Sequence, residues 1–214
     1  MVETTEDMEG RAIAGDRKIQ GYISEFSNGV FAFAITLLIL NVAVPTITNK
    51  EDLGSALISM WPNYLAFIIS FIIIGLFWSV YIRLLRDIVR TDHRFIMLNL
   101  LNLLFIVVIP FSTSLMSVYL TELSVIIYAA LMACAGFMHT VLKIYAGMDN
   151  RLIRTGYSRR DIRLGILLSL IIPVWFALSI GIAVFSIPAA QISWAVVFIG
   201  YSVLVHRVRD RLFI

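Results

Sequence analysis

The sequence predicts an all-α membrane protein with six transmembrane helices and both termini in the cytoplasm. Of its 214 residues, 60% are hydrophobic and only 14% are charged, whereas a soluble domain usually has about 25% charged residues. The apolar residues form long runs, and about 20 of them suffice to cross the hydrocarbon core of a bilayer. The composition therefore excludes an ordinary soluble domain and a disordered chain. A single cysteine excludes a disulfide framework.

Six apolar runs define the expected domain organisation. Residues 1–23 form a cytoplasmic leader, residues 24–206 form the six-span domain, and residues 207–214 form a cytoplasmic tail. The expected spans are 24–47, 56–82, 95–118, 123–142, 164–185 and 189–205. Pro188 separates the last two, because proline interrupts a helix.

Basic residues indicate the orientation of these spans. Sixteen of the 17 lysine and arginine residues lie in the leader, the second-to-third connection, the fourth-to-fifth connection or the tail, and the exception is Lys50. Cytoplasmic segments of membrane proteins are enriched in basic residues, so these four segments are assigned to the cytoplasm. Six spans satisfy this assignment, whereas an odd number would put basic residues on both sides.

The spans offer almost no groups for chemistry. Ionisable residues inside a membrane are costly and are therefore candidates for function. Glu25 lies at the entry of the first span and His139 near the end of the fourth, where interfacial and packing roles are expected. The sequence contains no metal-binding motif, nucleophile motif or glycine-rich phosphate loop. We therefore expect no enzyme activity, no catalytic or metal-binding residues, no cofactor and no nucleic-acid partner.

A heptad stripe runs along the first span. Apolar residues recur at alternating steps of four and three, namely Phe26, Val30, Phe33, Leu37, Leu40 and Val44. This spacing is typical of a helix that faces copies of itself around an axis. A row of small residues beside the stripe allows close approach of another helix; it consists of Gly29, Ala32, Thr36 and Ala43. Ordinary helix packing or a lipid-facing surface would also explain the stripe.

Two sequence blocks carry a family resemblance. Residues 26–32 read FSNGVFA, and AITLL follows at residues 34–38. Residues 99–105 read NLLNLLF, residues 109–113 read IPFST, and Phe77-Trp78 ends the second span. The first block resembles the first-span signature R-x-x-x-F-S-D-G-V-F-A-x-A-I-T-L-L of the transmembrane protein 175 potassium channel family, in its short prokaryotic six-span form. The others resemble that family's third-span block and the end of its second span.

The resemblance implies a potassium-preferring cation channel in the cell membrane. It implies a homotetramer with a central pore lined by the first helix of each subunit, passive conduction of K⁺, and membrane lipid as a further partner. The family's apolar constriction falls on Phe33, Leu37 and Leu40, and its polar threonine layer falls on Thr36. The sequence contains no T-V-G-Y-G filter, which agrees with the family.

Several positions depart from the family pattern. Tyr22 stands in place of arginine, Asn28 in place of aspartate and Tyr81 in place of histidine. Hydroxyl and amide groups can still form hydrogen bonds, and we expect a network among the signature residues Tyr22, Phe26, Ser27, Asn28, Trp78 and Tyr81. Phe33 stands where an aliphatic residue is expected. Four phenyl rings would form a bulky hydrophobic constriction, which predicts a low-conductance or mostly closed pore.

Three alternatives remain at the level of sequence. A proton-permeable relative could use Thr36, Asn41 and water. A secondary transporter would require discontinuous helices and a charged site near the membrane midplane, and neither is visible. A non-conducting membrane scaffold would use the heptad stripe for assembly alone.

Overall fold

A computed structural model describes residues 5–42, 44–46, 52–147, 152–153 and 158–212. Within these ranges the chain is helical apart from short connections and one isolated β-bridge. The elements are α1 (Thr5–Leu37), the 3₁₀-helix η1 (Leu38–Asn41), α2 (Leu53–Ser59), α3 (Trp61–Asp87), α4 (His93–Tyr119), α5 (Glu122–Gly147), α6 (Arg159–Phe185) and α7 (Ile187–Leu212).

Five helical segments of the described chain are long and apolar enough to cross a membrane. They are Lys18–Asn41, Trp61–Asp87, His93–Tyr119, Glu122–Gly147 and Arg159–Phe185. A shorter apolar stretch, Ile187–Tyr201, forms the first part of α7. The all-helical prediction and the multi-pass membrane prediction are confirmed.

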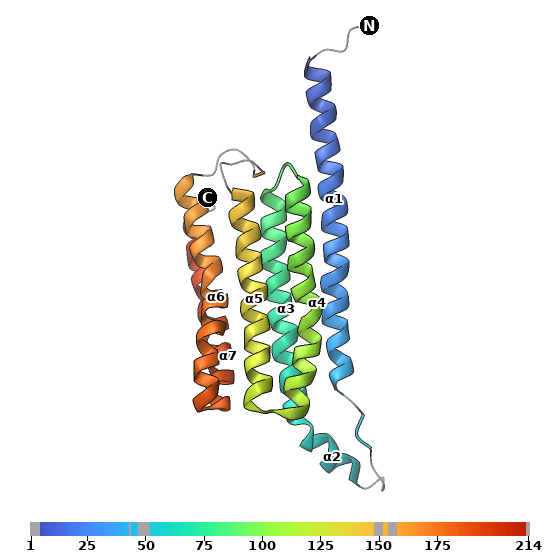
Figure 1. Cartoon of the computed structure of the whole chain (residues 1–214), viewed down its shortest axis with the longest axis vertical. Coiled ribbons are helices and arrows are strands. Elements are labelled where there is room, and N and C mark those ends of the chain that lie inside the picture. Colours follow the sequence, from blue (N-terminus) through green and yellow to red (C-terminus); the bar gives the residue numbers. More distant parts are fainter. Residues whose placement is uncertain (1–4, 43, 47–51, 148–151, 154–157, 213–214) are drawn as a thin grey trace.

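The helices stand side by side as a bundle (Figure 1). α1 packs on α3 and α4, α5 packs between α4 and α6, and α7 packs on α6. The start of α1, the α3–α4 connection, the end of α5, the start of α6 and the end of α7 lie at one end of the bundle, which we call the arginine-rich end (Figure 1). The opposite end holds α2 and the α4–α5 and α6–α7 turns. Lys50, Arg151 and Arg154 lie outside the described residues.

The first helix differs from the predicted span 24–47 at both ends. α1 has 33 residues, so it is about 50 Å long and exceeds the thickness of a bilayer core. It starts at Thr5, inside the predicted leader, and helical structure stops at Asn41. Pro45 disfavours a helical conformation at Val44, and Val42 already leaves the helix with ψ of 77°. Ala43 and Ile47 lie outside the described residues.

The second predicted span, 56–82, contains a break. α2 ends at Ser59 and α3 begins at Trp61 with Pro62 in its first turn, where proline is tolerated because its missing N–H has no helical acceptor. α3 then continues beyond the predicted end to Asp87. The other observed helices contain the predicted spans 95–118, 123–142, 164–185 and 189–205. Extended Ser186 separates the last two, at the predicted break.

Hydrogen bonds hold the connections at the arginine-rich end. Asp92 caps α4 by accepting from the backbone N–H of Phe95 at 2.8 Å, and the hydroxyl of Tyr145 on α5 donates to the other Asp92 oxygen at 2.6 Å. Val89 N–H donates to the carbonyl of Leu152 at 2.8 Å. The two connections are therefore joined, which fixes the relative heights of α3, α4 and α5.

Candidate functional site

α1 has two faces with opposite surroundings. One face is buried against α3 and α4 and consists of Ile23, Ser27, Phe31 and Ala34 on α1, continued by Leu38 on η1. The other carries the heptad stripe: Phe33 is 72% exposed and Leu40 is 73% exposed, whereas Phe31 is 1% exposed and Leu38 is fully buried. Most of the stripe is thus uncovered in the subunit, whereas Val30 is half-buried and packs against the core.

The end of the stripe lies on the 3₁₀ turn. In such a turn residues three apart lie directly above one another, so Leu40 is aligned with Leu37. The amide of Asn41 donates to the carbonyl of Pro110 on α4 at 3.1 Å. This bond attaches the last turn of the span to the bundle and thereby positions Leu40. Val44 is also exposed but lies beyond the helix.

Thr36 lies on the exposed side of α1. Its hydroxyl donates to the carbonyl of Phe33 at 2.9 Å. A threonine hydroxyl has one proton and two acceptor lone pairs, so the bond satisfies the donor and leaves acceptor capacity. Thr36 can therefore present an oxygen to a cation or a water molecule at the level between Phe33 and Leu37.

Three buried side chains form a closed triangle behind α1. The hydroxyl of Tyr81 on α3 lies 2.7 Å from Ser27 Oγ and 2.8 Å from Asn99 Oδ1, and Asn99 Nδ2 donates to Ser27 Oγ at 3.1 Å. The ring of Tyr81 also packs on Phe31, with centroids 5.4 Å apart. Polar groups in a low-dielectric interior are costly unless paired, so the triangle fixes where α1 sits on α3 and α4.

A separate hydrogen bond joins Asn28 and Trp78. The indole Nε1 of Trp78 donates to Asn28 Oδ1 at 3.0 Å. The expected network of signature residues is thus divided into two parts, one around Ser27 and Tyr81 and one around Asn28 and Trp78. Tyr22 and Phe26 join neither part within the described chain: they are 59% and 57% exposed on the uncovered face.

Sequence reasoning missed Asn99 as a member of the triangle. Asn99 belongs to the third-span block that carried the resemblance, and a polar amide in an apolar run was the signal that could have identified it. The sequence analysis also did not predict a second buried cluster. In this cluster Thr113 Oγ1 donates to Ser70 Oγ at 2.9 Å, and Ser70 Oγ lies 3.1 Å from the hydroxyl of Tyr128. This cluster joins α3, α4 and α5.

The described residues contain no group of three or more histidine, cysteine, aspartate or glutamate side chains that could hold a metal ion. Glu25 is exposed on α1. His139 is buried on α5, where its ring and the ring of Tyr81 form a T-shaped contact with centroids 6.4 Å apart. The uncovered face of α1 between Phe26 and Asn41 carries no charged residue. It offers an apolar surface with one hydroxyl layer.

Residues 22–110 match the family described as endosomal/lysosomal potassium channel TMEM175. A potassium channel of Chamaesiphon minutus is 35% identical over 155 residues, which cover 70% of this chain and 76% of that protein. The chain belongs to the TMEM175 family. The family resemblance inferred from the two sequence blocks is confirmed, and the family is one of ion channels rather than enzymes.

A solved structure and a vertebrate relative extend this comparison. The crystal structure of a lysosomal potassium-selective TMEM175 homolog from Chamaesiphon minutus superimposes with a TM-score of 0.77 at 29% identity, covering 87% of this chain and 97% of that chain. The endosomal/lysosomal proton channel TMEM175 of Gallus gallus is 34% identical over 103 residues, which cover 44% of this chain and 21% of that protein. The relatives of this chain therefore include proteins named potassium channels and proteins named proton channels.

Proposed function

We propose that this protein is a potassium-preferring cation channel that conducts passively through a central pore lined by α1 of four subunits. The observation that carries this proposal is the uncovered apolar face of α1. Phe33, Leu37 and Leu40 are exposed at heptad spacing on a helix whose opposite face is fully buried. The Chamaesiphon minutus relative is named a potassium channel, which supports the choice of ion.

Self-association of α1 is supported by the small residues beside the stripe. A Cβ atom added at Gly29 would have no neighbour within 4 Å, and Ala32 is exposed. Small residues allow helices in a membrane to approach closely, where van der Waals contacts stabilise their association. A fourfold arrangement would bring the four stripes together around one axis.

The barrier in this pore is the ring of Phe33, Leu37 and Leu40. A narrow apolar ring excludes water and blocks ions, because an ion cannot shed its hydration shell there. Four Phe33 side chains would make the ring bulky, so the pore is mostly closed at rest. Thr36, with its free acceptor lone pairs, supplies the hydroxyl layer that influences selectivity.

We further propose that the chain crosses the membrane six times, with α7 as the last crossing, and that both termini are cytoplasmic in the cell membrane. The apolar stretch Ile187–Tyr201 covers only part of a bilayer core, but α7 continues to Leu212. The basic residues described in the connections gather at one end of the bundle. The positive-inside rule assigns that end to the cytoplasm.

Proton conduction is the second candidate, since the vertebrate relative is named a proton channel. A proton path inside one subunit is unfavourable. Between the triangle and the cluster around Ser70, α3 and α4 carry buried apolar residues: Ile73 follows Ser70 before Tyr81 on α3, and Ile106 follows Asn99 before Thr113 on α4. A proton path would therefore follow the α1 axis, past Thr36 and Asn41.

Flux from liposomes tests the proposal. Vesicles holding the purified protein contain potassium, the outside contains an impermeant cation, and a pH-sensitive dye reports the resulting potential through an added proton carrier. We expect a potassium-driven signal that decreases when sodium replaces potassium. A signal driven by a pH gradient alone, without monovalent cations and without the proton carrier, would assign the protein to proton conduction. Absence of flux from both the parent and Phe33→Ala would indicate a non-conducting scaffold.

A further inference from the structure

Glu25 is the single acidic residue of the membrane-spanning segment Lys18–Asn41, whose other charged residue is Lys18. An ionisable residue in such a segment is costly and is therefore a candidate for function. Glu25 is exposed, and its carboxylate forms no hydrogen bond or ion pair with the residues that the structure describes. The subunit alone therefore gives this charge no partner.

The helix around Glu25 is attached to the bundle on both sides. Gln20 Nε2 donates to the carbonyl of Leu85 on α3 at 2.6 Å, and Ser27 belongs to the triangle with Tyr81. Glu25 lies between these two attachments. Its backbone is therefore fixed, and its exposed side chain starts from the side of α1 that the bundle does not cover.

Glu25 and Thr36 lie on the same side of α1. They are eleven residues apart, which is close to three helical turns, so they share a direction and are separated by about 16 Å along the axis. Phe33, the first residue of the proposed barrier, lies only about 12 Å beyond Glu25. An assembly that presents the hydroxyl of Thr36 to ions therefore presents the carboxylate of Glu25 to the same path, before the barrier.

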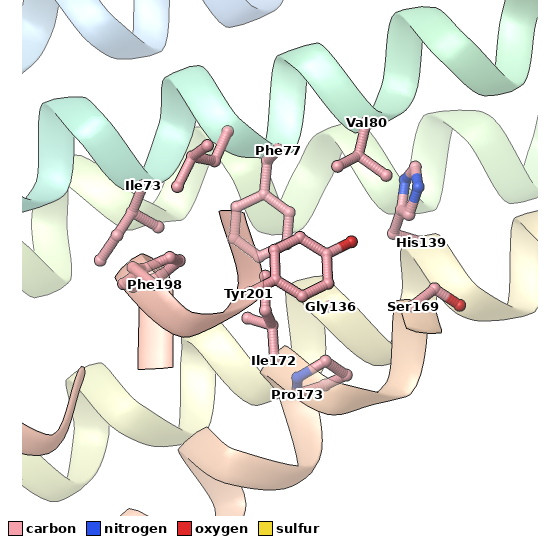
Figure 2. A pocket seen from close by; sticks show the side chains of 11 residues that line it. Ile73, Phe77, Val80, Gly136, His139, Ser169, Ile172, Pro173, Phe198 and Tyr201 are labelled. Atoms are coloured by element: carbon pink, nitrogen blue, oxygen red, sulfur yellow. The ribbon is translucent and has the colours of Figure 1, made fainter. Parts of the chain in front are cut away.

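The crevice between α3, α5, α6 and α7 does not offer ions another route (Figure 2). Ile73 and Phe198 lie at one end of it, and His139 and Ser169 lie at the other (Figure 2). Its volume of about 20 Å³ suits one water molecule, which needs at least about 10–15 Å³. None of its lining residues carries a carboxylate. Cations that cross the assembly therefore follow the axis of α1, past Glu25.

The nearest basic residue on α1 lies farther from the barrier than Glu25 does. Lys18 is exposed and precedes Glu25 by seven residues, or about 10 Å of helix. Interactions between exposed charges separated by more than a Debye length, about 10 Å at 0.1 M salt, are largely screened. Lys18 therefore weakens the field of Glu25 at the barrier without cancelling it.

We propose that Glu25 is a specificity-determining residue of the channel, and that its four copies form a ring of carboxylates at the entrance on the arginine-rich side. This inference rests on the proposed function. Rings of acidic side chains favour cations in channels, and charges of one sign that line an entrance raise the local concentration of counter-ions. The ring concentrates K⁺ in front of the apolar barrier and repels anions.

Glu25→Gln tests the ring, because it removes the charge and keeps the size of an exposed side chain. Flux is measured from liposomes at one potassium concentration, with an impermeant salt setting the ionic strength to about 0.1 M or about 1 M, where the Debye length falls from about 10 Å to about 3 Å. We expect several-fold less potassium flux than in wild type at the lower ionic strength and nearly equal flux at the higher one.

Two further variants separate charge from structure. Glu25→Asp keeps the charge and should retain the flux of wild type. Glu122→Gln, at an exposed glutamate that starts α5 at the opposite end of the bundle, is the matched control and should leave flux unchanged. Equal flux in wild type and Glu25→Gln at both ionic strengths would overturn the ring. A loss that persists unchanged at about 1 M would also overturn it, because a structural defect is not screened by salt.

Thiol accessibility provides a second test that needs no flux. In a Cys134→Ser background, Glu25→Cys should react several-fold faster with a water-soluble methanethiosulfonate than Met97→Cys does. Met97 is exposed on α4, and it lies at the depth of Glu25, because each precedes by two residues a member of the bonded pair Asn99 and Ser27. Equally slow reaction of the two cysteines would overturn the ring.

The two proposals fail in different ways. Absence of flux from both wild type and Phe33→Ala would overturn the channel and the ring with it. Potassium flux in wild type that Glu25→Gln does not change would overturn the ring alone.

Discussion

Phe31 and Phe33 lie two positions apart on α1 and face opposite surroundings. Phe31 is 1% exposed and packs on the ring of Tyr81, whereas Phe33 is 72% exposed. In a helix two residues differ by about 200° in direction, so one phenylalanine supports the bundle while the other is available to copies of the subunit. This division separates the stability of the subunit from the barrier proposed for the pore.

The first prediction follows from this pair. Phe33→Ala should raise potassium flux several-fold, because it removes the bulkiest part of the constriction, and should leave the melting temperature nearly unchanged. Phe31→Ala should destabilise the subunit by about 3–5 kcal/mol, the range for buried aromatic truncations. Flux assays and thermal unfolding in detergent measure the two effects. Phe137→Ala, an exposed phenylalanine on α5, is the control, and equal flux in it and Phe33→Ala would rule out Phe33 as the gate.

The second prediction concerns the triangle of Ser27, Tyr81 and Asn99. Tyr81→Phe removes the central hydroxyl and leaves buried partners unpaired, which should cost about 1–3 kcal/mol of unfolding free energy. Tyr22→Phe makes the same chemical change at an exposed position and should cost almost nothing. Thermal unfolding of both variants provides the comparison. Equal losses would mean that the triangle contributes no stability of its own.

The third prediction concerns the contact between α5 and α6. Gly136→Ala places a Cβ atom 2.8 Å from Pro173 Cβ, and the resulting overpacking should destabilise the bundle by about 1–3 kcal/mol. Gly75→Ala is the matched change on α3, where a new Cβ atom has no neighbour within 4 Å. Gly75→Ala should be neutral or slightly stabilising, because alanine favours helix. If both variants melt alike, the close approach at Pro173 is not restrictive.

The fourth prediction concerns the bond from Asn41 to the carbonyl of Pro110. Asn41→Ala removes the attachment of the 3₁₀ turn to α4, so Leu40 should lose its fixed position and the constriction should loosen. We expect higher flux and a weaker preference for potassium over sodium. Asn41→Asp also lacks the amide donor and should show the same loosening. Unchanged flux and ion preference in both variants would separate Asn41 from the barrier.

Local properties of the chain were sufficient to predict which segments form the helices of the bundle. Long apolar runs require helices in a membrane, because backbone groups there must be satisfied internally. The break before Pro188 follows from the geometry of proline, and the heptad spacing selected the residues of the stripe while leaving open whether they pack inside the subunit or outside it. The residues of the first-span signature also pointed to the family.

The grouping of polar residues depended on tertiary contacts, and one such contact attaches the last helical turn of the first span to α4. Helical structure stops at Asn41, whose side chain bonds to Pro110 on another helix, 69 positions along the chain. Asn99 joins Ser27 across 72 positions, while Tyr22, near Ser27 in sequence, faces outward. Hydropathy and periodicity describe one helix at a time, so they do not predict which side chains of different helices come into contact.

The sequence by itself determined the membrane class, the helices and the heptad spacing of the stripe, because each depends on the composition and period of a single segment. Only the tertiary structure decided which polar side chains meet, which face of α1 stays uncovered and that a crevice lies beside His139. These features depend on how several helices pack together, and distances between helices are set by particular contacts such as Gly136 against Pro173.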